Sequence, residues 1–375
     1  MKYESAQQTA IRPGLPAHTI RERDTQPEHG EKASANGERP VRVAMPLMNS
    51  AYPVGKCREF IEAIPDEDVR AIAWGEYYYY SGQAELAAET MKPYEGSADP
   101  ALRYSASLVS FFANFTRGRI QQAMRAFEQM QADLRNDLRN DLRRDSAPVQ
   151  RAIGAFAVTA SSVLLHLPMG CEVDLQQYIC YLPDGLKLWA CYMLAHRMYL
   201  EKNYNGSLAI AELSLSMSLR VYPVSAIYVH LVAAMDLMSL KRVEEAKRHM
   251  AQAWALAQHD GFIEPFGEHH GLLQGMIELF FQKDYPEEFE KIIAITYSFS
   301  AGWRKIHRRI ARHEVADNLT TTEFPIAMLY NHGWTAKEIA AYMLLSPRTI
   351  TNTIQVIYQK LGISSKRELG QFMLS

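Results

Sequence analysis

The sequence predicts an all-α protein, an α-helical solenoid followed by a small helical domain at the C-terminus. Apolar residues recur at helical spacing nearly throughout from about Phe60 to Lys305, and no run of alternating β-branched residues is bounded by hairpin turns. Of the 375 residues, 48% are hydrophobic, which is enough for a sizeable core. We therefore expect all of the regular secondary structure to be helical.

A loosely repeated pattern divides the helical region into units. Short turns are expected near Gly82, Gly118, Lys202, Lys241 and Lys283, so each unit is an antiparallel helix pair. The long interval between the second and third turns predicts an additional, degenerate unit at residues 161–182. Small residues would let the paired helices approach closely; they are Gly75, Ala87, Ala123, Ala195, Ala234 and Ala246. The pattern resembles tetratricopeptide-type repeats with longer units.

The boundaries follow from composition. Residues 1–55 are predicted to be a disordered tail, 56–300 a helical-repeat domain for sensing or interaction, 301–317 a basic linker, and 318–375 the C-terminal domain. Residues 301–375 contain 10 Lys and Arg against 5 Asp and Glu, whereas the formal net charge of the chain is −2. An acidic body with a basic end suits a nucleic-acid partner at that end alone.

The lack of a targeting signal and the spacing of the cysteines predict a cytoplasmic protein. No apolar segment follows Met1, and the longest apolar tract, residues 153–167, is too short and too polar to span a bilayer. The four cysteines show no CxxC spacing, as expected of a reducing compartment. We therefore expect no membrane partner.

Four helix starts fall within about fifty residues of the C-terminal domain. Three have a hydroxyl residue followed three positions later by Glu, which is the pattern of a capping box, and the fourth has Ser followed by Pro. They are Thr320 with Glu323, Thr335 with Glu338, Ser365 with Glu368, and Ser346-Pro347. So dense a set of start signals predicts four short helices.

The second and third of these helices form a helix-turn-helix. Only Leu344-Leu345 separates them, and Ile350, Ile354, Ile357 and Leu361 give the third helix one apolar face. Its opposite face is polar and rich in amides; it carries Arg348, Thr351, Asn352, Gln355 and Gln359. Amide side chains pair with adenine and Arg pairs with guanine or a phosphate, so this face fits a major groove.

These motifs resemble the LuxR-type (GerE-like) DNA-binding domain over nearly all of residues 318–375. The matching positions include Glu338-Ile339-Ala340, Thr349-Ile350, Ile357-Tyr358 and Lys360-Leu361-Gly362. The repeats likewise look like those of large LuxR-type regulators with solenoid sensor domains. The resemblance implies a bacterial transcription regulator that binds duplex DNA as a homodimer, with the third helix in the major groove and the fourth at the dimer contact. The apolar residues Leu369, Phe372, Met373 and Leu374 favour that dimer contact.

The candidate DNA-contacting residues combine this resemblance with helical phase. They are Thr335, Lys337, Arg348, Thr351, Asn352, Gln355, Gln359, Lys360 and Lys366. Thr351 stands where the family usually has Lys, Thr353 where it often has His, and Lys366 replaces a usual Arg. Pro325 is expected inside the first helix, just past its first turn, at the cost of a backbone hydrogen bond.

No constellation for chemistry stands out, so neither an enzyme nor a cofactor or metal is predicted. Residues 54–57 (Val-Gly-Lys-Cys) lack the residues of a phosphate loop, and the adjacent His269-His270 point too far apart on a helix to chelate well. The tyrosines at 77–80 are mostly expected in the core. The predicted function is sequence-specific DNA binding, controlled by a small molecule or protein partner at the repeat domain. The alternative is a repeat scaffold for protein partners, with the helix-turn-helix used only for docking.

Overall fold

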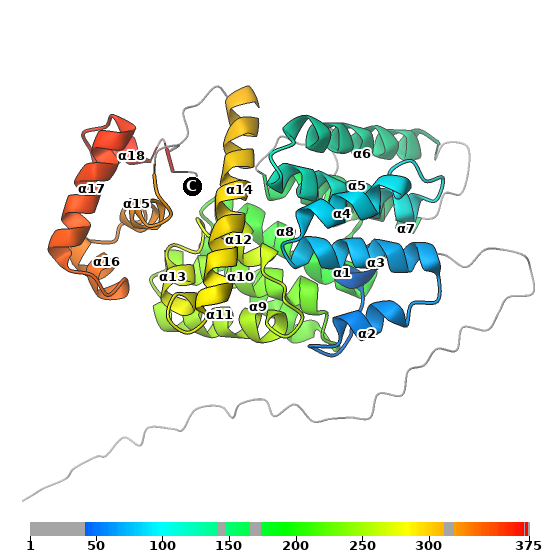
Figure 1. The fold of residues 1–375 in the computed structure, drawn as a ribbon, viewed down its shortest axis with the longest axis horizontal. Helices are drawn as coiled ribbons and strands as arrows, with labels where there is room; N and C mark the ends of the chain where they lie inside the picture. The colour runs from blue at the N-terminus through cyan, green and yellow to red at the C-terminus, as the bar shows by residue number, and fades with distance from the viewer. Residues whose placement is uncertain (1–41, 141–147, 166–173, 311–318, 371, 374–375) are drawn as a thin grey trace, which may run out of the picture. The chain divides into compact units, whose positions relative to one another are not determined.

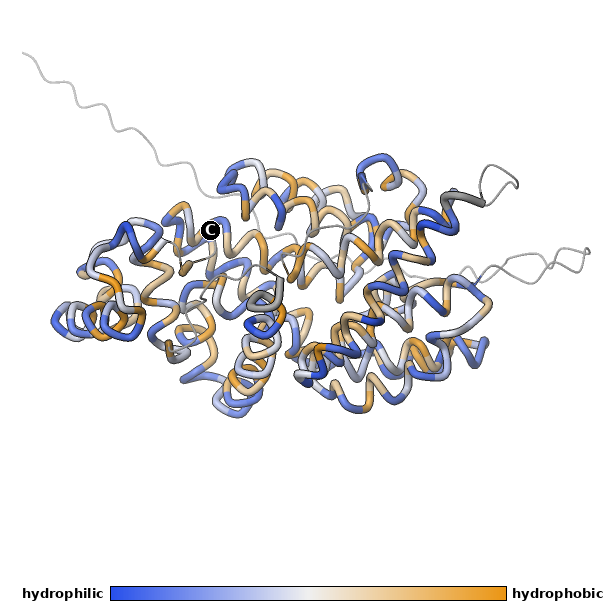
Figure 2. Tube along the Cα trace, turned by 90° about the horizontal axis from the view of Figure 1, so that it is seen from above, coloured by the Kyte–Doolittle hydropathy of each residue, from blue (hydrophilic) through white to orange (hydrophobic). Residues whose placement is uncertain are grey.

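The computed structural model describes residues 42–140, 148–165, 174–310, 319–370 and 372–373. Every regular element in these ranges is a helix (Figure 1), so the predicted all-α class is confirmed there. Residues 42–375 form one compact unit. Figure 2 shows hydrophobic and hydrophilic positions alternating along the helices, as expected of helices with one buried side.

The elements follow one another without long connections in the described ranges. The α-helices up to residue 310 are α1 Pro46–Asn49, α2 Cys57–Glu62, α3 Glu67–Tyr80, α4 Ala84–Met91, α5 Pro100–Thr116, α6 Ile120–Asn140, α7 Pro148–Val163, α8 Asp184–Leu200, α9 Tyr204–Met217, α10 Pro223–Ser239, α11 Val243–Ala257, α12 Glu264–His269, α13 Met276–Phe281 and α14 Pro286–Ile310. Short 3-10 turns lie at Lys92–Tyr94, Leu175–Gln177 and Ile179–Tyr181. The C-terminal helices are α15 Glu323–Asn331, α16 Ala336–Tyr342, α17 Pro347–Leu361 and α18 Lys366–Leu369.

Neighbouring helices pack in sequence, with α3 against α4, α5 against α6, α8 against α9 and α10 against α11. Four of the expected turns join these pairs and share one backbone conformation. Gly82, Gly118, Lys202 and Lys241 have φ values of 78°, 68°, 62° and 59°. In each turn the N–H of the following residue bonds to the carbonyl five residues earlier; at Lys241 the Arg242 N–H reaches the Leu237 carbonyl at 2.8 Å. The four turns are therefore structurally equivalent.

Small residues allow the close helix packing that the sequence predicts. A Cβ on Gly75 of α3 would lie 1.9 Å from the Met91 Cε of α4, so only glycine fits there without rearrangement. Ala195 of α8 and Ala234 of α10 are completely buried at their helix contacts. Helix spacing is thus set by side-chain size at these positions.

Two predicted boundaries differ from the structure. Residues 42–55 are not part of a tail: Met45 and Leu47 are fully buried, and residues 46–49 form α1. Residues 301–310 are not a linker, because α14 continues through them to Ile310 and buries Ile306. The rest of these predicted segments, residues 1–41 and 311–317, lies outside the described residues.

The predicted degenerate unit at residues 161–182 is not a helix pair in its described part. It consists of the end of α7 and two 3-10 turns, and residues 166–173 lie outside the described residues. Instead α6 packs against α7, and α7 packs against α8. Apolar spacing alone cannot distinguish a short helix from a turn with buried side chains.

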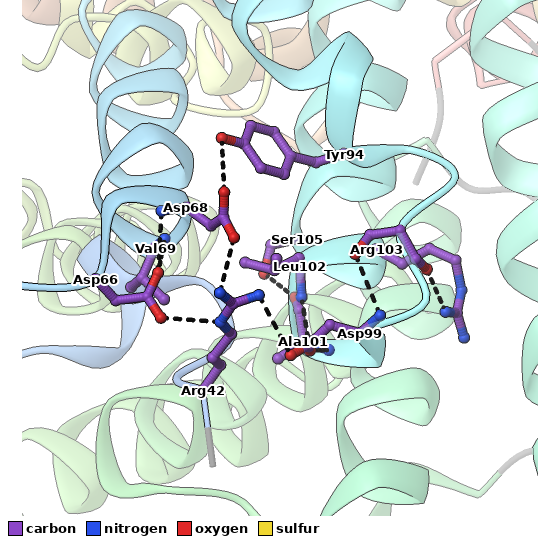
Figure 3. A network of polar contacts seen from close by, with 11 residues as sticks. Arg42, Asp66, Asp68, Val69, Tyr94, Asp99, Ala101, Leu102, Arg103 and Ser105 are labelled. Carbon is purple, nitrogen blue, oxygen red and sulfur yellow. Dashed lines mark hydrogen bonds and ion pairs between the residues drawn. The ribbon is translucent and has the colours of Figure 1, made fainter. Parts of the chain in front are cut away.

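Charged side chains attach the segment that begins at Arg42 to helices α3 and α5. Arg42 contacts Asp66 at 2.9 Å, Asp68 at 2.7 Å and Asp99 at 3.7 Å (Figure 3). Asp66 and Asp99 are also the N-caps of α3 and α5, so one guanidinium joins two helix starts. Buried Glu76 of α3 completes the attachment by accepting the backbone N–H groups that begin α1, including that of Leu47 at 2.9 Å.

Carboxylates that follow α11 reach back to the first helices. Asp260 accepts the N–H groups of Gly55 and Cys57 at 2.8 and 3.0 Å, so the weak phosphate-loop pattern binds a carboxylate of its own chain. Glu268 of α12 accepts the Tyr79 hydroxyl of α3 and, at 2.8 Å, the Tyr228 hydroxyl of α10. Of the four tyrosines at 77–80, Tyr77, Tyr79 and Tyr80 are buried in the core, and Tyr78 is only partly buried. Helix α12 also packs along α14.

Two of the equivalent turns carry a lysine in a conformation that favours glycine. We expect Lys202→Gly to raise the free energy of unfolding by about 0.5–1 kcal/mol, because left-handed backbone costs a side-chain-bearing residue about 1–2 kcal/mol and glycine's unfolded entropy offsets part of the gain. As the matched control, Lys247→Gly in the interior of α11 should lower it by about 1 kcal/mol. Urea unfolding measures both variants; equal losses in the two would contradict the assignment of strain.

Burial raises the pKa of Glu76 to about 8, although two backbone N–H groups bond its carboxylate and act in the opposite direction. A pKa that is higher in the folded state than in the unfolded state stabilises the fold at low pH. This contribution is complete below the pKa of the unfolded state and is lost as the pH rises through the pKa of the folded state. The free energy of unfolding of the parent relative to Glu76→Gln should therefore fall between pH 5 and 7.5, by up to about 1.4 kcal/mol per pH unit. Urea unfolding at several pH values measures the slope, with exposed Glu290→Gln as the control for carboxyl loss. Parallel parent and Glu76→Gln profiles would contradict the prediction.

Candidate DNA-binding interface

Helices α15 to α18 form the C-terminal domain, called the reader below (residues 319–373 as described). Helix α17 packs against α15 and α16, and α18 packs against α15. Ile350, Ile354 and Ile357 are buried as predicted, whereas Leu361 at the end of α17 is only partly buried. One face of α17 thus holds the reader together and the other faces outward.

Three of the four predicted helix starts form as expected. Thr335 and Glu338 make a complete capping box, and Ser346 accepts the Thr349 N–H at 3.0 Å, with Pro347 at the first helical position. Thr320 and Glu323 exchange the same pair of hydrogen bonds at 2.8 and 3.2 Å. These bonds satisfy backbone N–H groups at the start of each helix that have no partner within the helix itself.

The fourth start differs. Ser365 precedes α18, but its side chain accepts no backbone N–H; its hydroxyl instead donates to the Glu368 carboxylate at 2.6 Å. Glu368 also accepts the N–H of Ser364, one residue earlier than predicted, at 3.1 Å. The extended backbone of Ser365, with φ −143°, differs from the conformation of the other caps and displaces the box by one residue.

Pro325 interrupts the hydrogen bonds at the start of this helix, as the sequence predicts. The N–H of the preceding Phe324 donates to the Thr320 carbonyl at 2.9 Å, so the N–H that proline lacks is the next one in that series. Thr321 and Thr322 therefore form a turn, and α15 begins at Glu323 with Pro325 as its third residue. Its side chain is buried in the reader.

A tight turn at residues 343–346 joins α16 to α17. Leu344 has φ 56°, and the Leu345 N–H reaches the Ala340 carbonyl at 2.9 Å, which closes the end of α16. Ala340 is 2% exposed, as its small size at the helix crossing predicts. The helix-turn-helix is thus formed by residues 336–361.

All nine candidate DNA-contacting residues have exposed side chains; they are Thr335, Lys337, Arg348, Thr351, Asn352, Gln355, Gln359, Lys360 and Lys366. Arg348, Asn352, Gln355 and Gln359 recur at intervals of four, three and four residues along α17, which aligns them on one side. The repeat region leaves this side uncovered, so its amides and guanidinium are available to a partner.

Other candidates already have partners inside the chain. Lys360 forms an ion pair with Glu323 of α15 at 2.7 Å, and the Lys366 ammonium lies 4.6 Å from the centre of the Tyr330 ring. The Thr335 hydroxyl caps α16, and the Thr351 hydroxyl donates to the Pro347 carbonyl at 2.9 Å. These residues therefore support the reader's own fold, and DNA contact by them would compete with that role.

The last apolar residues do not form the exposed patch that was predicted for a dimer contact. Leu369 is 1% exposed and Met373 2% exposed within the chain, and Phe372 is partly buried. They cover the reader's own core because α18 is only four residues long and folds back against α15. Their apolar character is satisfied without a partner, and Leu374, the fourth residue of the predicted set, lies outside the described residues.

Lys241 is a residue that the sequence analysis missed as part of this region. From the α10–α11 turn its ammonium donates to Glu338 at 3.0 Å and to the Gly333 carbonyl at 3.2 Å, and it lies 5.6 Å from the Trp334 ring centre. Hydrogen bonds from Thr335, followed by the Lys241 contact, hold the pKa of Glu338 at about 2. The pair is 97 residues apart in sequence, and no local pattern signals it.

The geometry defines a helix-turn-helix domain whose third helix presents a polar face, the class of fold that reads DNA. Residues 317–373 match the family model described as bacterial regulatory proteins, luxR family. Residues 317–373 therefore form a domain of the luxR-family type, as the sequence predicted. No curated protein and no solved structure matches the chain.

The described residues include neither a membrane-spanning helix nor a metal site. No helix in the described part of the chain is both long and apolar enough to cross a membrane. Within the same residues, no group of three or more His, Cys, Asp and Glu side chains is arranged to hold a metal ion. His269 instead contacts the Tyr192 hydroxyl and the Pro265 carbonyl, at 2.8 and 2.7 Å.

The capping box of α16 predicts a local stability effect. Thr335→Ala should lower the protection of the α16 amides by about 1 kcal/mol, because it leaves the Glu338 N–H without its side-chain acceptor. Thr353→Ala is the matched control: its hydroxyl only donates to a carbonyl of its own helix, so a change below about 0.5 kcal/mol is expected. Native-state hydrogen exchange measures both, and equal effects would argue against the cap.

Proposed function

We propose that the chain is a bacterial, sequence-specific DNA-binding transcription regulator, with α17 in the major groove. The exposed face of α17 carries this proposal, because it combines one guanidinium with three amides opposite the face that buries Ile350, Ile354 and Ile357. A merely solvated helix face has no need of so many groups that can read base edges. The luxR-family match over the same residues supports it.

In this proposal the bases are contacted by Arg348, Asn352, Gln355 and Gln359. Thr351 lacks the long cation that the family usually has, and Lys360 is paired with Glu323. Lys337 lies at an exposed position suited to a phosphate contact, whereas Thr335 and Lys366 would reach phosphates only by giving up their partners inside the reader. Binding as a homodimer to two half-sites follows from the resemblance and is part of the proposal.

The helical-repeat region is proposed to be a tetratricopeptide-like domain that senses a small molecule or protein partner. Its equivalent turns and sequentially packed helix pairs support a repeat origin. The Lys241–Glu338 contact gives it a direct connection to the reader. A regulator of this kind acts in the cytoplasm, on the nucleoid, and needs no enzymatic activity.

DNA binding by the full chain tests the proposal. Fluorescence anisotropy with labelled duplexes should show affinity that falls steeply with salt, since phosphate contacts release counterions. Binding-site selection should then enrich one sequence. A folded chain that binds duplexes no better than a neutral control protein at low salt would refute DNA reading and favour the scaffold alternative.

Substitutions in α17 test which face reads the bases. Asn352→Ala or Gln355→Ala should each cost about 1–3 kcal/mol on the selected site and relax base preference at one position. Thr351→Lys should tighten binding to every sequence and steepen the salt slope by about one unit. Gln282→Ala, an exposed amide of the repeat region, is the matched control. Unchanged preference in both alanine variants would show that another face meets the DNA.

A further inference from the structure

A cavity of about 150 Å³ lies where α12, α14 and the reader meet, all within the compact unit of residues 42–375. Its walls come from both regions. The lining includes Glu268, Phe299 and Trp303 from the repeat region and Phe324, Met328 and Phe372 from the reader. A molecule in this space would touch both.

The size and the walls of the cavity limit the kind of molecule. Half of the lining residues are aromatic or aliphatic, and a volume of this size accommodates a single aromatic ring with little more. Thr296 and Ser300 of α14 add hydroxyl groups to the same wall. The cavity therefore suits a one-ring compound with a short polar substituent.

Glu268 is the acidic residue in the described lining of this cavity. The Tyr79 and Tyr228 hydroxyls both donate to it, which favours the charged form. Among the described residues, no ion pair joins Glu268 to Lys, Arg or His. Glu264, one turn earlier on α12, is fully buried, and burial together with the neighbouring Glu268 raises its pKa well above the usual range.

The electrostatic environment of Glu268 would be improved by an added positive charge. Burial raises the pKa of Glu268, against the effect of the two tyrosine hydroxyls, because the charged form of the carboxyl is poorly solvated there. An ammonium group within hydrogen-bond distance would replace the missing solvation and complete a buried, hydrogen-bonded ion pair. An anionic ligand would instead meet repulsion from this carboxylate.

We propose that the cavity binds a small arylalkylamine, with its ring between Trp303 and Phe324 and its ammonium group on Glu268. Arg304 lines the cavity as well, so a carboxylate ligand is the alternative that a test must include. The amine is favoured because Glu268 is the deeply buried charge of the two, with two fixed donors that hold the carboxylate in place.

Such a ligand is placed to act as an effector, a role that rests on the proposed function. It contacts α14 and the reader at once, so its binding energy depends on their relative position. By linkage, any position of the reader that binds the amine more tightly is favoured when the amine is present. The ligand site itself does not require DNA binding.

Titration calorimetry of the full chain without DNA tests the site, with phenethylamine as the probe. We expect a dissociation constant of about 0.1–1 mM, which is ordinary for a ligand of this size. The neutral 2-phenylethanol and the anionic 3-phenylpropanoate have the same ring and similar length, and each should bind at least about tenfold more weakly. Equal or tighter binding of either compound would overturn the proposal.

Substitutions in the cavity test whether phenethylamine binds there. Glu268→Gln should weaken phenethylamine at least about tenfold and leave 2-phenylethanol nearly unchanged. Glu264→Gln is the matched control, since Glu264 is a buried carboxyl of the same helix that does not line the cavity; its loss should leave the amine affinity unchanged or higher. Ser300→Phe, which fills the cavity, should abolish binding of all three compounds and serves if Glu268→Gln does not fold.

The outcomes separate this site from DNA reading. Amine binding that survives both Glu268→Gln and Ser300→Phe, or no amine binding by the folded parent, would refute the site whether or not the chain binds DNA. Amine binding that both variants remove supports the site even if no duplex binds, in which case only the proposed function fails. If both hold, phenethylamine at saturation should shift the DNA affinity of the parent at least about threefold and leave that of Ser300→Phe unchanged.

Discussion

Buried carboxylates in residues 260–268 determine how the helical array closes on itself. Asp260 and Glu268 accept hydrogen bonds from segments about 190 to 205 residues earlier in the chain. A buried carboxylate without donors is strongly unfavourable, so α12 is stable only in the register that brings those donors to it. The position of α12 then places α14, which packs along it, and both supply walls of the cavity next to the reader.

The same physical rule shapes the reader, where charged residues serve the fold first. Lys360 is neutralised by Glu323, and Glu338 is shared between its own helix start and Lys241 of the repeat region. The groove-facing side of α17 is left with amides and a single guanidinium. Such a face contributes little non-specific attraction to phosphates, so discrimination between sequences depends on the geometry of hydrogen bonds.

Several features reduce stability in exchange for position. Lys202 and Lys241 adopt left-handed backbone that glycine would adopt without strain, and Glu76 is buried at the cost of its preferred charge state. At Lys241 the gain is visible, because the same turn carries the ammonium that reaches the reader. Glu76 likewise ties the first helix of the chain to the core. Departures of this kind are common where a protein must hold two parts in a defined relation.

The sequence by itself determined the features that depend on neighbouring residues. Helical spacing, the hydroxyl caps at Thr335 and Ser346, and the turns at Gly82 and Lys241 are local, so their energetics could be predicted from a short window. Tertiary structure alone decided the burial of Met373, the pairing of Lys360 with Glu323 and the meeting of Glu268 with Tyr79. These contacts join residues far apart in the chain, and a local pattern cannot specify which distant group will satisfy a buried charge or cover an apolar side chain.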